Sequence, residues 1–388
     1  MDKVILKRTS RILAGHPWIF SNELSTSPKR FGPGSLVEVY DNRNEYIGAG
    51  YINPNSLIAI RLLTREREKI DAGFFRRRIT AALRYRERFL PDTGSCRLVF
   101  SEGDFLPGLM VDKYADCIVI QILTLGMEKQ KDTITGLLDE MLAPSVIVLR
   151  NDSRTRILEG LSLEKKIVKG RLDTLPVIRE GEALLEVDPL SGQKTGSFLD
   201  QRENRIAFSR LAKGGRGLDL FCYSGAWGLQ LARRGMQVTF VDDSEAALAR
   251  ARRNAELNGV AGTCDFVKDD AFAFLKSEAE SGSGYDSVAL DPPAFVKSKL
   301  KIKEALRGYR EINAMAMRIV KSGGLLATSS CSYHIDRMVF LDMLRTASRD
   351  SRKSFRLLEY RSQGKDHPVA LSIPETEYLK CAFLEASH

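Results

Sequence analysis

Apolar residues along the first 70 positions recur at short intervals and are broken by turn-forming residues. Four runs of five to eight residues are separated by Pro33-Gly34, Asp41-Asn42 and Asn53-Pro54. Runs bounded in this way are typical of strands. The pattern predicts a small β domain over residues 1–70, with strands at 3–7, 34–41, 46–52 and 57–63.

After residue 70 the spacing of apolar residues changes from that of strands to that of a helix. Apolar residues from Phe75 to Leu83 keep helical spacing opposite six arginines that lie between Arg76 and Arg88. Further along, a helical pattern at 127–142 lies between strand-like runs at 117–124 and 145–150. We therefore expect a middle α+β domain over residues 71–180.

From Arg210 onward, strand-like and helical patterns alternate. This alternation is typical of a doubly wound parallel sheet with helices on both faces. The expected fold class is α/β, with a Rossmann-like domain over residues 181–388. Its strands are predicted at 215–222, 237–242, 264–270, 285–293 and 323–330, and its clearest helices at 225–235 and 244–259.

The charge of the chain favours a polyanionic partner. Lys and Arg number 59 against 50 Asp and Glu, which gives a net charge of +9 at pH 7. Such an excess favours contacts with nucleic acid phosphates. The arginines between Arg76 and Arg88 form either an RNA-facing stripe or a solvated helix face, and the sequence does not decide between the two.

Composition argues against several classes of protein. No run approaches the roughly eighteen apolar residues of a membrane span, and the N-terminus lacks the apolar core of a signal peptide. We therefore expect a cytoplasmic protein without membrane contact. The six cysteines are scattered without a CxxC pair, and only four histidines are present, so we expect neither a disulfide framework nor a metal site.

Acidic residues recur where the predicted strands end, and ligands of such sheets bind at the carboxyl ends of the strands. Asp219 leads into a turn of small residues, and Asp242 follows 23 residues later, where a carboxylate binds the hydroxyls of a ribose. Asp269 or Asp270 is suited to accept from an adenine amino group. The turn lacks GxGxxG, which argues against a dinucleotide and a dehydrogenase. Carboxylates also serve as plain helix caps, so the set, rather than any one member, predicts S-adenosylmethionine.

The fourth strand of this sheet ends at Asp291, which is followed by Pro292, Pro293, Ala294 and Phe295. The two prolines fix two φ angles and hold the carboxylate and the aromatic ring at the edge of the sheet. That combination suits a planar base that has been swung out of its stack. The structural alternative is a rigid strand exit with a packed phenylalanine.

Four motifs occur in a fixed order, "LDLFCYSG", "VDDS", "LDPPAF" and "SSCS". In that order they resemble the class I S-adenosylmethionine-dependent RNA methyltransferases, specifically the large-subunit ribosomal RNA 5-methylcytosine group. "RILAGHPWIFSNEL" with "PGSLVEVYD" resembles the PUA RNA-binding domain of that group, and "EGDFLPGLMVDKYAD" resembles its middle domain. The resemblance covers nearly the whole chain and implies large-subunit ribosomal RNA as the partner.

The resemblance extends the expected cofactor site to the segment from Gln193 to Arg205, whose plainer interpretation is a charged helix start. Together with the strand ends, the residues expected to bind S-adenosylmethionine are Lys194, Phe198, Asp200, Gln201, Arg202, Asp219, Phe221, Cys222, Tyr223, Ser224, Gly225, Asp242, Ser244, Asp269, Asp270 and Asp291. Those expected to bind the RNA substrate are Pro292, Pro293, Phe295, Lys297 and Lys299.

Cys331 is the candidate nucleophile. Cytosine is too electron-poor at C5 to accept a methyl group unaided, and a thiolate that adds at C6 corrects this. Cys331 follows the strand at 323–330, at the same sheet edge as Asp291, which is expected to bind the N3/N4 edge of the base. A buried small hydrophobe is the plain alternative. His334 is a weak candidate for the C5 proton acceptor, which stays unassigned.

Two other functions compete with this interpretation. The Asp-Pro-Pro-aromatic motif also resembles that of amino-group methyltransferases, which need no thiol. A ribosome-assembly factor that keeps the fold without catalysis is the second, although the complete set of Asp219, Asp242 and Asp291 argues against it. The sequence determines neither the target nucleotide nor the oligomeric state, and a homodimer is left open.

Overall fold

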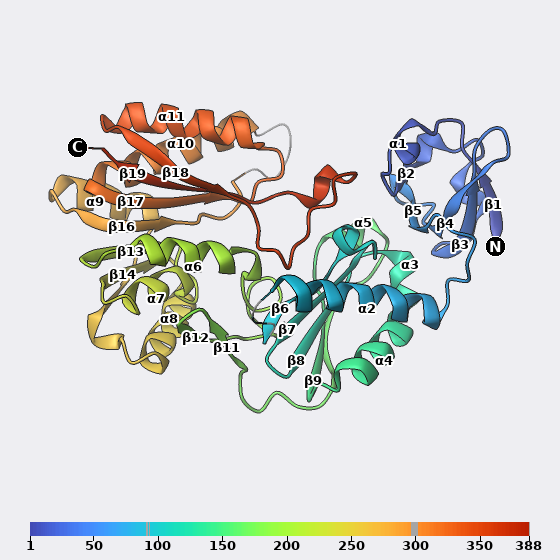
Figure 1. Ribbon diagram of the computed structural model, residues 1–388, viewed down its shortest axis with the longest axis horizontal. Coiled ribbons are helices and arrows are strands. Elements are labelled where there is room, and N and C mark those ends of the chain that lie inside the picture. Colours follow the sequence, from blue (N-terminus) through green and yellow to red (C-terminus); the bar gives the residue numbers. More distant parts are fainter. Residues whose placement is uncertain (91, 93, 296–301, 388) are drawn as a thin grey trace. The chain divides into compact units, whose positions relative to one another are not determined.

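The computed structural model describes residues 1–90, 92, 94–295 and 302–387 (Figure 1). Lys297 and Lys299 therefore lie outside the described residues. The chain divides into two compact units of similar length. The first unit comprises Met1–Pro176, Val187–Leu199 and Lys365–Thr376, and the second comprises Val177–Glu186, Asp200–Gly364 and Glu377–His388. The division into three domains predicted from the sequence stays a prediction.

The first unit opens with a five-stranded sheet of order β1-β3-β4-β5-β2. Strands β1 and β3 are parallel and the other neighbours are antiparallel. All four predicted strands occur, and β2 and the short helix α1 are added. The bounds are β1 Asp2–Ile5, α1 Ser10–Leu13, β2 Trp18–Phe20, β3 Ser35–Tyr40, β4 Tyr46–Ile52 and β5 Ile58–Thr64.

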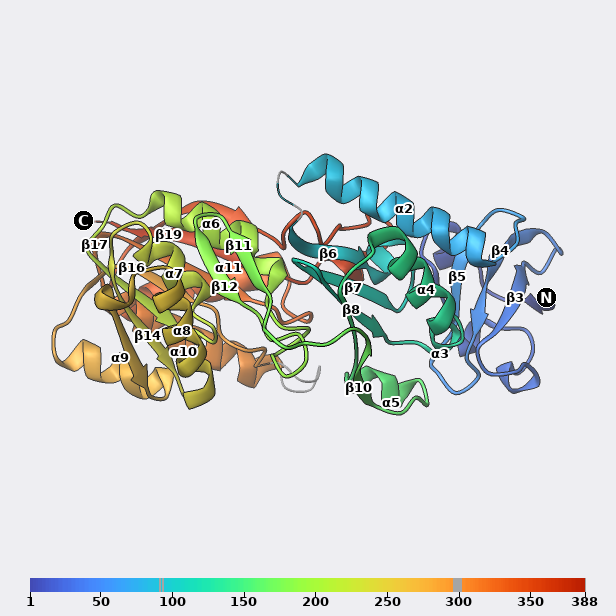
Figure 2. The same cartoon turned by 90° about the horizontal axis from the view of Figure 1, so that it is seen from below.

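A second five-stranded sheet, of order β10-β9-β8-β7-β6, follows in the same unit. Helices α2 and α4 bury apolar residues against it in one core, and Figure 2 shows both beside its strands. The bounds are α2 Ala72–Phe89, β6 Ser95–Phe100, β7 Leu109–Tyr114, β8 Cys117–Ile122, α3 Leu125–Glu128, α4 Lys131–Leu142, β9 Val146–Asn151, α5 Thr155–Leu158 and β10 Glu164–Lys169.

The helix predicted at 127–142 occurs as α4, which begins at Lys131, and a separate short helix, α3, precedes it. Gly126 in α3 lies against the Tyr51 ring so closely that an added Cβ would be 1.9 Å from Cγ. Met127 beside it is fully buried. Packing of α3 on this aromatic ring, rather than helical periodicity, determines the structure before α4.

The arginines of α2 are partly engaged within the protein. Arg86 is buried, and its guanidinium donates to the carboxylate of Asp104. Arg76 forms an ion pair with Glu140. The hypothesis that all six arginines form a continuous RNA-facing stripe is therefore wrong, since the buried Arg86 side chain faces the protein interior.

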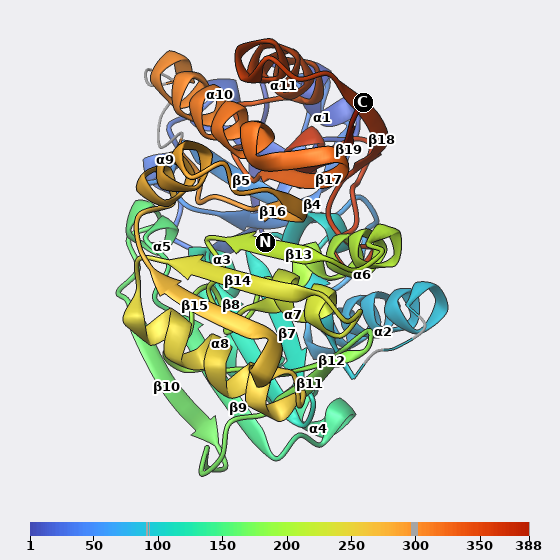
Figure 3. The same cartoon turned by 90° about the vertical axis from the view of Figure 1, so that its left-hand side faces the viewer.

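The second unit is built on a seven-stranded sheet of order β15-β14-β13-β16-β17-β19-β18. Figures 1 and 3 show α6, α7 and α8 on one side of it and α9, α10 and α11 on the other. The strands are β13 Arg216–Leu220, β14 Gln237–Asp242, β15 Cys264–Lys268, β16 Tyr285–Leu290, β17 Val320–Ser330, β18 Phe355–Arg361 and β19 Lys380–Ala386. The helices are α6 Arg202–Leu211, α7 Ala226–Ala232, α8 Glu245–Leu257, α9 Ala271–Glu280, α10 Ile302–Ile319 and α11 Arg337–Ser351.

Five of these strands are the predicted ones and are parallel to their neighbours. Strand β19, which the sequence did not predict, runs antiparallel to β17 and carries β18 on its outer side. Strand order reverses between β13 and β16, because the chain proceeds from β13 to β15 on one side and resumes at β16 on the other. The carboxyl ends of β13 and β16 therefore flank the switch point, where ligands of such sheets bind.

A hairpin of β11 (Val177–Glu180) and β12 (Ala183–Glu186) belongs to the second unit. Its Glu180 forms a buried, two-pronged ion pair with Arg205 of α6. Asn254 of α8 accepts from the backbone N–H of Glu186 at 2.8 Å and so joins the hairpin to the helix. None of the described helices is long and apolar enough to cross a membrane.

Candidate active site

The turn between β13 and α7 has an unusual backbone. Phe221, Tyr223 and Gly225 take positive φ angles of 59°, 50° and 82°. At Gly225 an added Cβ would lie 3.0 Å from the Phe240 ring, so the turn sits directly against β14. The turn is closed by its own hydrogen bonds, since the N–H of Cys222 donates to the C=O of Val241 at 3.1 Å and that of Gly225 to the C=O of Cys222 at 2.8 Å. That a ligand approaches the backbone here stays a prediction.

Asp219 lies at the base of this turn and is fully buried. Its Oδ2 accepts from the backbone N–H of Gly228 at 2.7 Å, and its Oδ1 has no hydrogen-bond partner among the described residues. Burial raises the pKa of Asp219 to about 8, and the nearby charge of Asp291 adds to the shift. A large fraction of this carboxyl is therefore protonated at neutral pH.

Asp242 ends β14 and fastens the same turn. Its Oδ2 accepts from the N–H of Tyr223 at 2.9 Å and its Oδ1 from the N–H of Ser244 at 3.0 Å. Burial raises the pKa of this carboxyl too. The hydroxyl of Tyr223 accepts from Arg250 at 3.0 Å, so the turn is held from two sides.

Two predicted cofactor residues are helix caps. Ser244 accepts from the N–H of Ala247 at the start of α8, and Asp270 accepts from the N–H groups of Phe272 and Ala273 at the start of α9. Capping accounts for both side chains without a ligand. Asp269 is half-buried and follows β15 directly, so it is the better placed of the two carboxylates for an adenine.

Cys222 is buried inside the turn, where burial raises the pKa of its thiol well above the usual range. Its surroundings therefore disfavour a reactive thiolate. Ser224 is buried beside it, and its backbone C=O accepts from Asn254 at 2.9 Å. Both residues form part of the wall of the turn.

Asp291 follows β16 and accepts two hydrogen bonds at its Oδ2. The donors are Nε2 of Gln201 at 3.0 Å and Nε1 of Trp227 at 3.1 Å. Burial raises the pKa of Asp291, and the charge of Asp200 raises it further. Trp227 was not among the predicted site residues, since a tryptophan inside an apolar helix pattern predicts only core packing.

The segment expected to extend the cofactor site is divided between the two units. Asp200, Gln201 and Arg202 belong to the second unit and are buried there, and Asp200 accepts from the hydroxyl of Tyr378 at 2.6 Å. Lys194 and Phe198 belong to the first unit, where the ammonium group lies 4.4 Å from the centre of the phenylalanine ring.

Cys331 directly follows β17 and is half-exposed. Strands β16 and β17 pair in parallel with Leu290 opposite Thr328, so the segments that carry Asp291 and Cys331 leave the sheet at the same edge. Pro292 is buried and Pro293 is exposed, while the Phe295 ring packs 4.6 Å from that of Tyr309.

The hydroxyl of Tyr309 joins the two loops at this edge. It lies 3.0 Å from Oγ of Ser332, donates to the C=O of Pro293 at 3.4 Å and accepts from the N–H of Phe295 at 3.4 Å. Tyr309 is fully buried in α10, and burial raises its pKa. Helical periodicity predicts only that this residue lies in the core, so its bridge between the two loops could not be predicted from the sequence.

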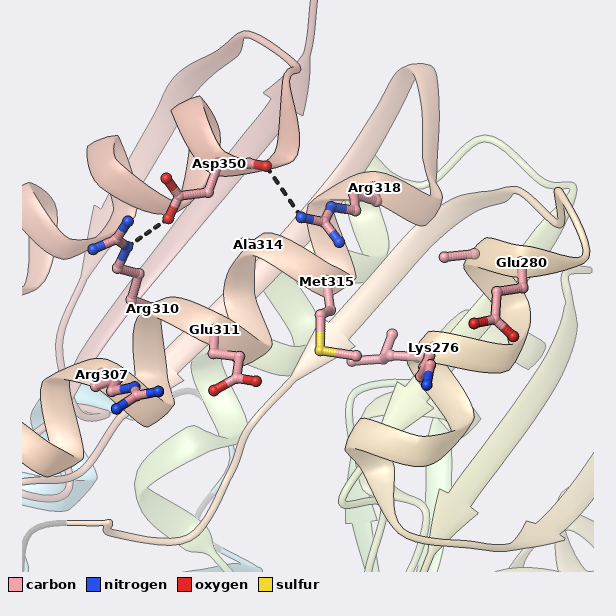
Figure 4. A pocket seen from close by; sticks show the side chains of 11 residues that line it. Lys276, Glu280, Arg307, Arg310, Glu311, Ala314, Met315, Arg318 and Asp350 are labelled. Atoms are coloured by element: carbon pink, nitrogen blue, oxygen red, sulfur yellow. Dashed lines mark hydrogen bonds and ion pairs between the residues drawn. The ribbon is translucent and has the colours of Figure 1, made fainter.

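A groove of about 950 Å³ lies elsewhere on the second unit (Figure 4). Side chains of α9, α10 and α11 line it, and none of them is a predicted site residue. Arg310 and Arg318 both donate to Asp350 there, through its carboxylate and its backbone C=O. No group of three or more potential metal ligands occurs in the part of the chain that is described.

Comparison with known proteins adds to this geometry. The profile of a PUA-like domain matches residues 4–65, and that of conserved hypothetical protein 95 matches residues 202–359. Ribosomal RNA large subunit methyltransferase I of Aeromonas hydrophila is 37% identical over 380 residues, which span 96% of this chain and 96% of the relative. Its counterpart in Pseudoalteromonas atlantica is 35% identical over 378 residues, again 96% of both chains. The chain belongs to the ribosomal RNA large subunit methyltransferase I family.

The fold of this family member agrees with a solved structure described as "a putative methyltransferase complexed with SAH". The TM-score is 0.85 at 18% identity, and the match covers 99% of this chain and 100% of the other. The predicted fold class is thereby confirmed as a class I S-adenosylmethionine-dependent methyltransferase fold with an N-terminal PUA-like domain.

Proposed function

We propose that this protein transfers the methyl group of S-adenosylmethionine to C5 of a cytosine in large-subunit ribosomal RNA, with Cys331 as nucleophile. The cofactor follows from the fold and the family. The observation that carries the finer proposal is the common edge of β16 and β17, where a carboxyl, a thiol and an aromatic ring come from Asp291, Cys331 and Phe295.

The residues at the switch point fit this cofactor. Burial raises the pKa of Asp219, Asp242 and Asp291, and the charges of Asp291 and Asp242 add to the shift of Asp219. A cationic ligand stabilises the ionised form of carboxyls that are held away from water in this way. S-adenosylmethionine carries a sulfonium and an ammonium group, and when bound it supplies an activated methyl group. The unpaired Oδ1 of Asp219 offers it a buried acceptor.

The side chains at the edge would divide the chemistry between them. The thiolate of Cys331 adds to C6 of the base, and its electron pair forms the S–C6 bond, which makes C5 nucleophilic. Asp291 binds the Watson–Crick edge. Because burial raises the pKa of Asp291, its protonated form is available to donate to N3 while its other oxygen accepts from N4. C5 would then form a bond to the methyl group as the bond from that methyl to the sulfonium sulfur breaks. Loss of the C5 proton and cleavage of the S–C6 bond then release the thiolate, and we assign no acceptor for that proton.

The first unit supplies a reason for an RNA substrate. It contains the PUA-like domain, and the chain as a whole carries a net charge of +9. The relatives in Aeromonas and Pseudoalteromonas bear names that specify large-subunit ribosomal RNA. We extend that substrate to this chain because the similarity spans both units.

The test is a methylation assay on unmodified large-subunit ribosomal RNA, followed by digestion to nucleosides and mass spectrometry. Wild-type protein should produce 5-methylcytidine, and Cys331→Ala should lower the rate by at least about 100-fold, because the nucleophile is lost. Cys264→Ala is the matched control. Cys264 is also half-buried at the second unit's sheet, but on the outer strand β15, and its removal should leave the rate within about twofold.

A different methylated nucleoside that Cys331→Ala still produces would overturn the cytosine C5 proposal. It would favour amino-group methylation, in which Asp291 and the prolines act without a thiol. A protein that binds S-adenosylmethionine and RNA but methylates neither this RNA nor its fragments would favour a non-catalytic assembly factor.

A further inference from the structure

Lys380 is a buried lysine beside the candidate nucleophile. It begins β19, where it pairs with Ser330, the residue before Cys331. The side chain is only 4% exposed. Its ammonium group donates to the backbone C=O of Ser332 and to that of Tyr378, both at 2.6 Å. Cys331 is thus flanked in sequence by two residues that contact this lysine.

The ammonium group of Lys380 has no carboxylate partner among the described residues, since no Asp or Glu oxygen there lies within 4.0 Å of it. Burial lowers its pKa to about 8, which reflects the cost of holding a cation away from water. Carbonyl dipoles offset only part of this cost, so a nearby anion would stabilise the site.

Besides the thiol of Cys331, three ionisable groups act on Lys380 or lie beside that thiol. Cys331, Glu377 and Asp336 each raise the pKa of Lys380, with the thiol as the largest of these influences. Glu377 and Asp336 are both exposed, so water screens their charges. Tyr309 faces the thiol from α10, and a negative charge on Cys331 raises the pKa of that hydroxyl. The thiol of Cys331 is therefore the group best situated to become the counter-charge of Lys380.

We propose that Lys380 is a positioning residue of this active site, whose ammonium group holds the Cys331 loop in place and stabilises the cysteine as its thiolate. The thiol loses its proton to water, and the ammonium group keeps its own proton. The sulfur then carries the electron pair that the addition to C6 requires. The role of this ammonium–thiolate pair in catalysis rests on the proposed function, whereas the formation of the pair does not.

The test measures the reactivity of the thiol without RNA or cofactor. Full-length wild-type protein and Lys380→Met are treated with iodoacetamide between about pH 5.5 and 9.5, and the alkylated Cys331 peptide is quantified by mass spectrometry. Because only the thiolate reacts, the midpoint of the rate profile reports its population. We expect Lys380→Met to raise this midpoint by at least about one pH unit and to lower the rate at pH 7 about tenfold. Lys380→Arg, which keeps the charge, should stay near wild type.

Lys353→Met is the matched control. Lys353 also donates to two backbone carbonyls at 2.6 Å, those of Arg318 and Val320, and burial also lowers its pKa. Its removal should cost similar stability and leave the Cys331 profile unchanged. Cys264 serves as an internal reference, since burial, together with the charge of Asp265, raises its pKa to about 11 and Lys380 makes no contribution to that shift.

Equal profiles for wild type and Lys380→Met, with both proteins folded by circular dichroism, would overturn the proposal. An equal effect of Lys353→Met would also overturn it, because the shift would then reflect loosening of the protein. Failure of the proposed function would give a different combination of methylation and alkylation results. In that case Cys331→Ala keeps its methylation activity while the alkylation profiles still differ between wild type and Lys380→Met.

Discussion

At the scale of single residues, Asp219 couples the stability of the protein to pH. Burial raises its pKa from the ordinary 3.8 to about 8, so between these values the folded protein holds a proton that the unfolded chain has released. The stability that this proton contributes is complete below about pH 4 and is lost as the pH rises through 8. The slope is about 1.4 kcal/mol per pH unit within that window for one group.

We predict that Asp219→Asn removes this dependence. The amide keeps the shape and the bond from Gly228 but does not ionise. Urea unfolding at several pH values between 5 and 9 should show a flatter loss of unfolding free energy in the variant than in the wild type, with the difference accumulating toward pH 8.

Asp286→Asn is the control for this experiment. Asp286 pairs with Lys321 at 2.8 Å and its pKa is lowered, so it is ionised in both the folded and the unfolded state above pH 5. Its replacement should leave the slope between pH 5 and 8 unchanged. A wild-type slope equal to that of Asp219→Asn would contradict the buried protonated carboxyl.

At the scale of elements, the ends of the strands combine two roles that the sequence does not separate. Asp269 and Asp270 are adjacent acids after β15, and either fits an adenine acceptor from its position alone. The structure gives Asp270 two backbone N–H donors at the start of α9. The end of a strand is also the start of a helix in this fold, so a carboxylate there serves the helix, the ligand or both.

We predict opposite outcomes for the two acids. Asp270→Ala should lower the unfolding free energy by about 1 kcal/mol, the usual cost of a lost cap, with unchanged S-adenosylmethionine affinity. Asp269→Ala should change stability less and weaken binding about tenfold, because it removes the proposed adenine acceptor. Isothermal titration and urea unfolding measure the two quantities, and a cofactor affinity that depends on Asp270 alone would reverse the assignment.

The sequence predicted those elements whose apolar pattern is strong in itself. Strands β14 and β16 and helix α8 were expected at nearly their observed bounds, since each alternates cleanly with its neighbours. Strands β18 and β19 were missed. Pairing with β17 stabilises β19 in the sheet interior, and that partner lies about fifty residues earlier, beyond the reach of a local pattern.

The same distinction holds for the site. Asp291 and Cys331 stand in recognisable motifs at strand ends, so their positions were predicted. Trp227, Tyr309 and Lys380 were not, although each contacts a motif residue or its neighbour. Trp227 and Tyr309 come from helices whose apolar pattern predicts core, and Lys380 comes from β19, which the local pattern did not predict. Only the sheet order brings a hydrogen-bonding group from each to this edge.

At the scale of the whole molecule, the second unit includes a short segment that precedes its main body in the sequence. Residues 177–186 form its hairpin, separated along the chain from the rest of the unit by Val187–Leu199 of the first unit. The buried ion pair of Glu180 with Arg205 fastens the hairpin to α6. Removing one partner of such a pair leaves a charge in a poorly solvated place.

We predict that Glu180→Ala lowers the unfolding free energy by about 3 to 5 kcal/mol. Glu182→Ala is a nearby control, since Glu182 is exposed and lies 3.9 Å from Arg234 in a surface pair, for which a change below about 1 kcal/mol is expected. Urea unfolding of both full-length variants provides the comparison. Similar small losses in the two would mean that the hairpin contributes little to the second unit.

The chain passes between the two units five times, after residues 176, 186, 199, 364 and 376. The last segment of the first unit is Lys365–Thr376, where Asp366 accepts from Arg86 through its backbone C=O and from the N–H of Arg97 through its carboxylate. On the ribosome these partners are synthesised some 270 residues before Asp366. Folding from the N-terminus therefore cannot complete the first unit, which contains the PUA-like domain, until nearly all of the methyltransferase sheet has been synthesised. The nascent chain therefore completes the folding of both units at almost the same time.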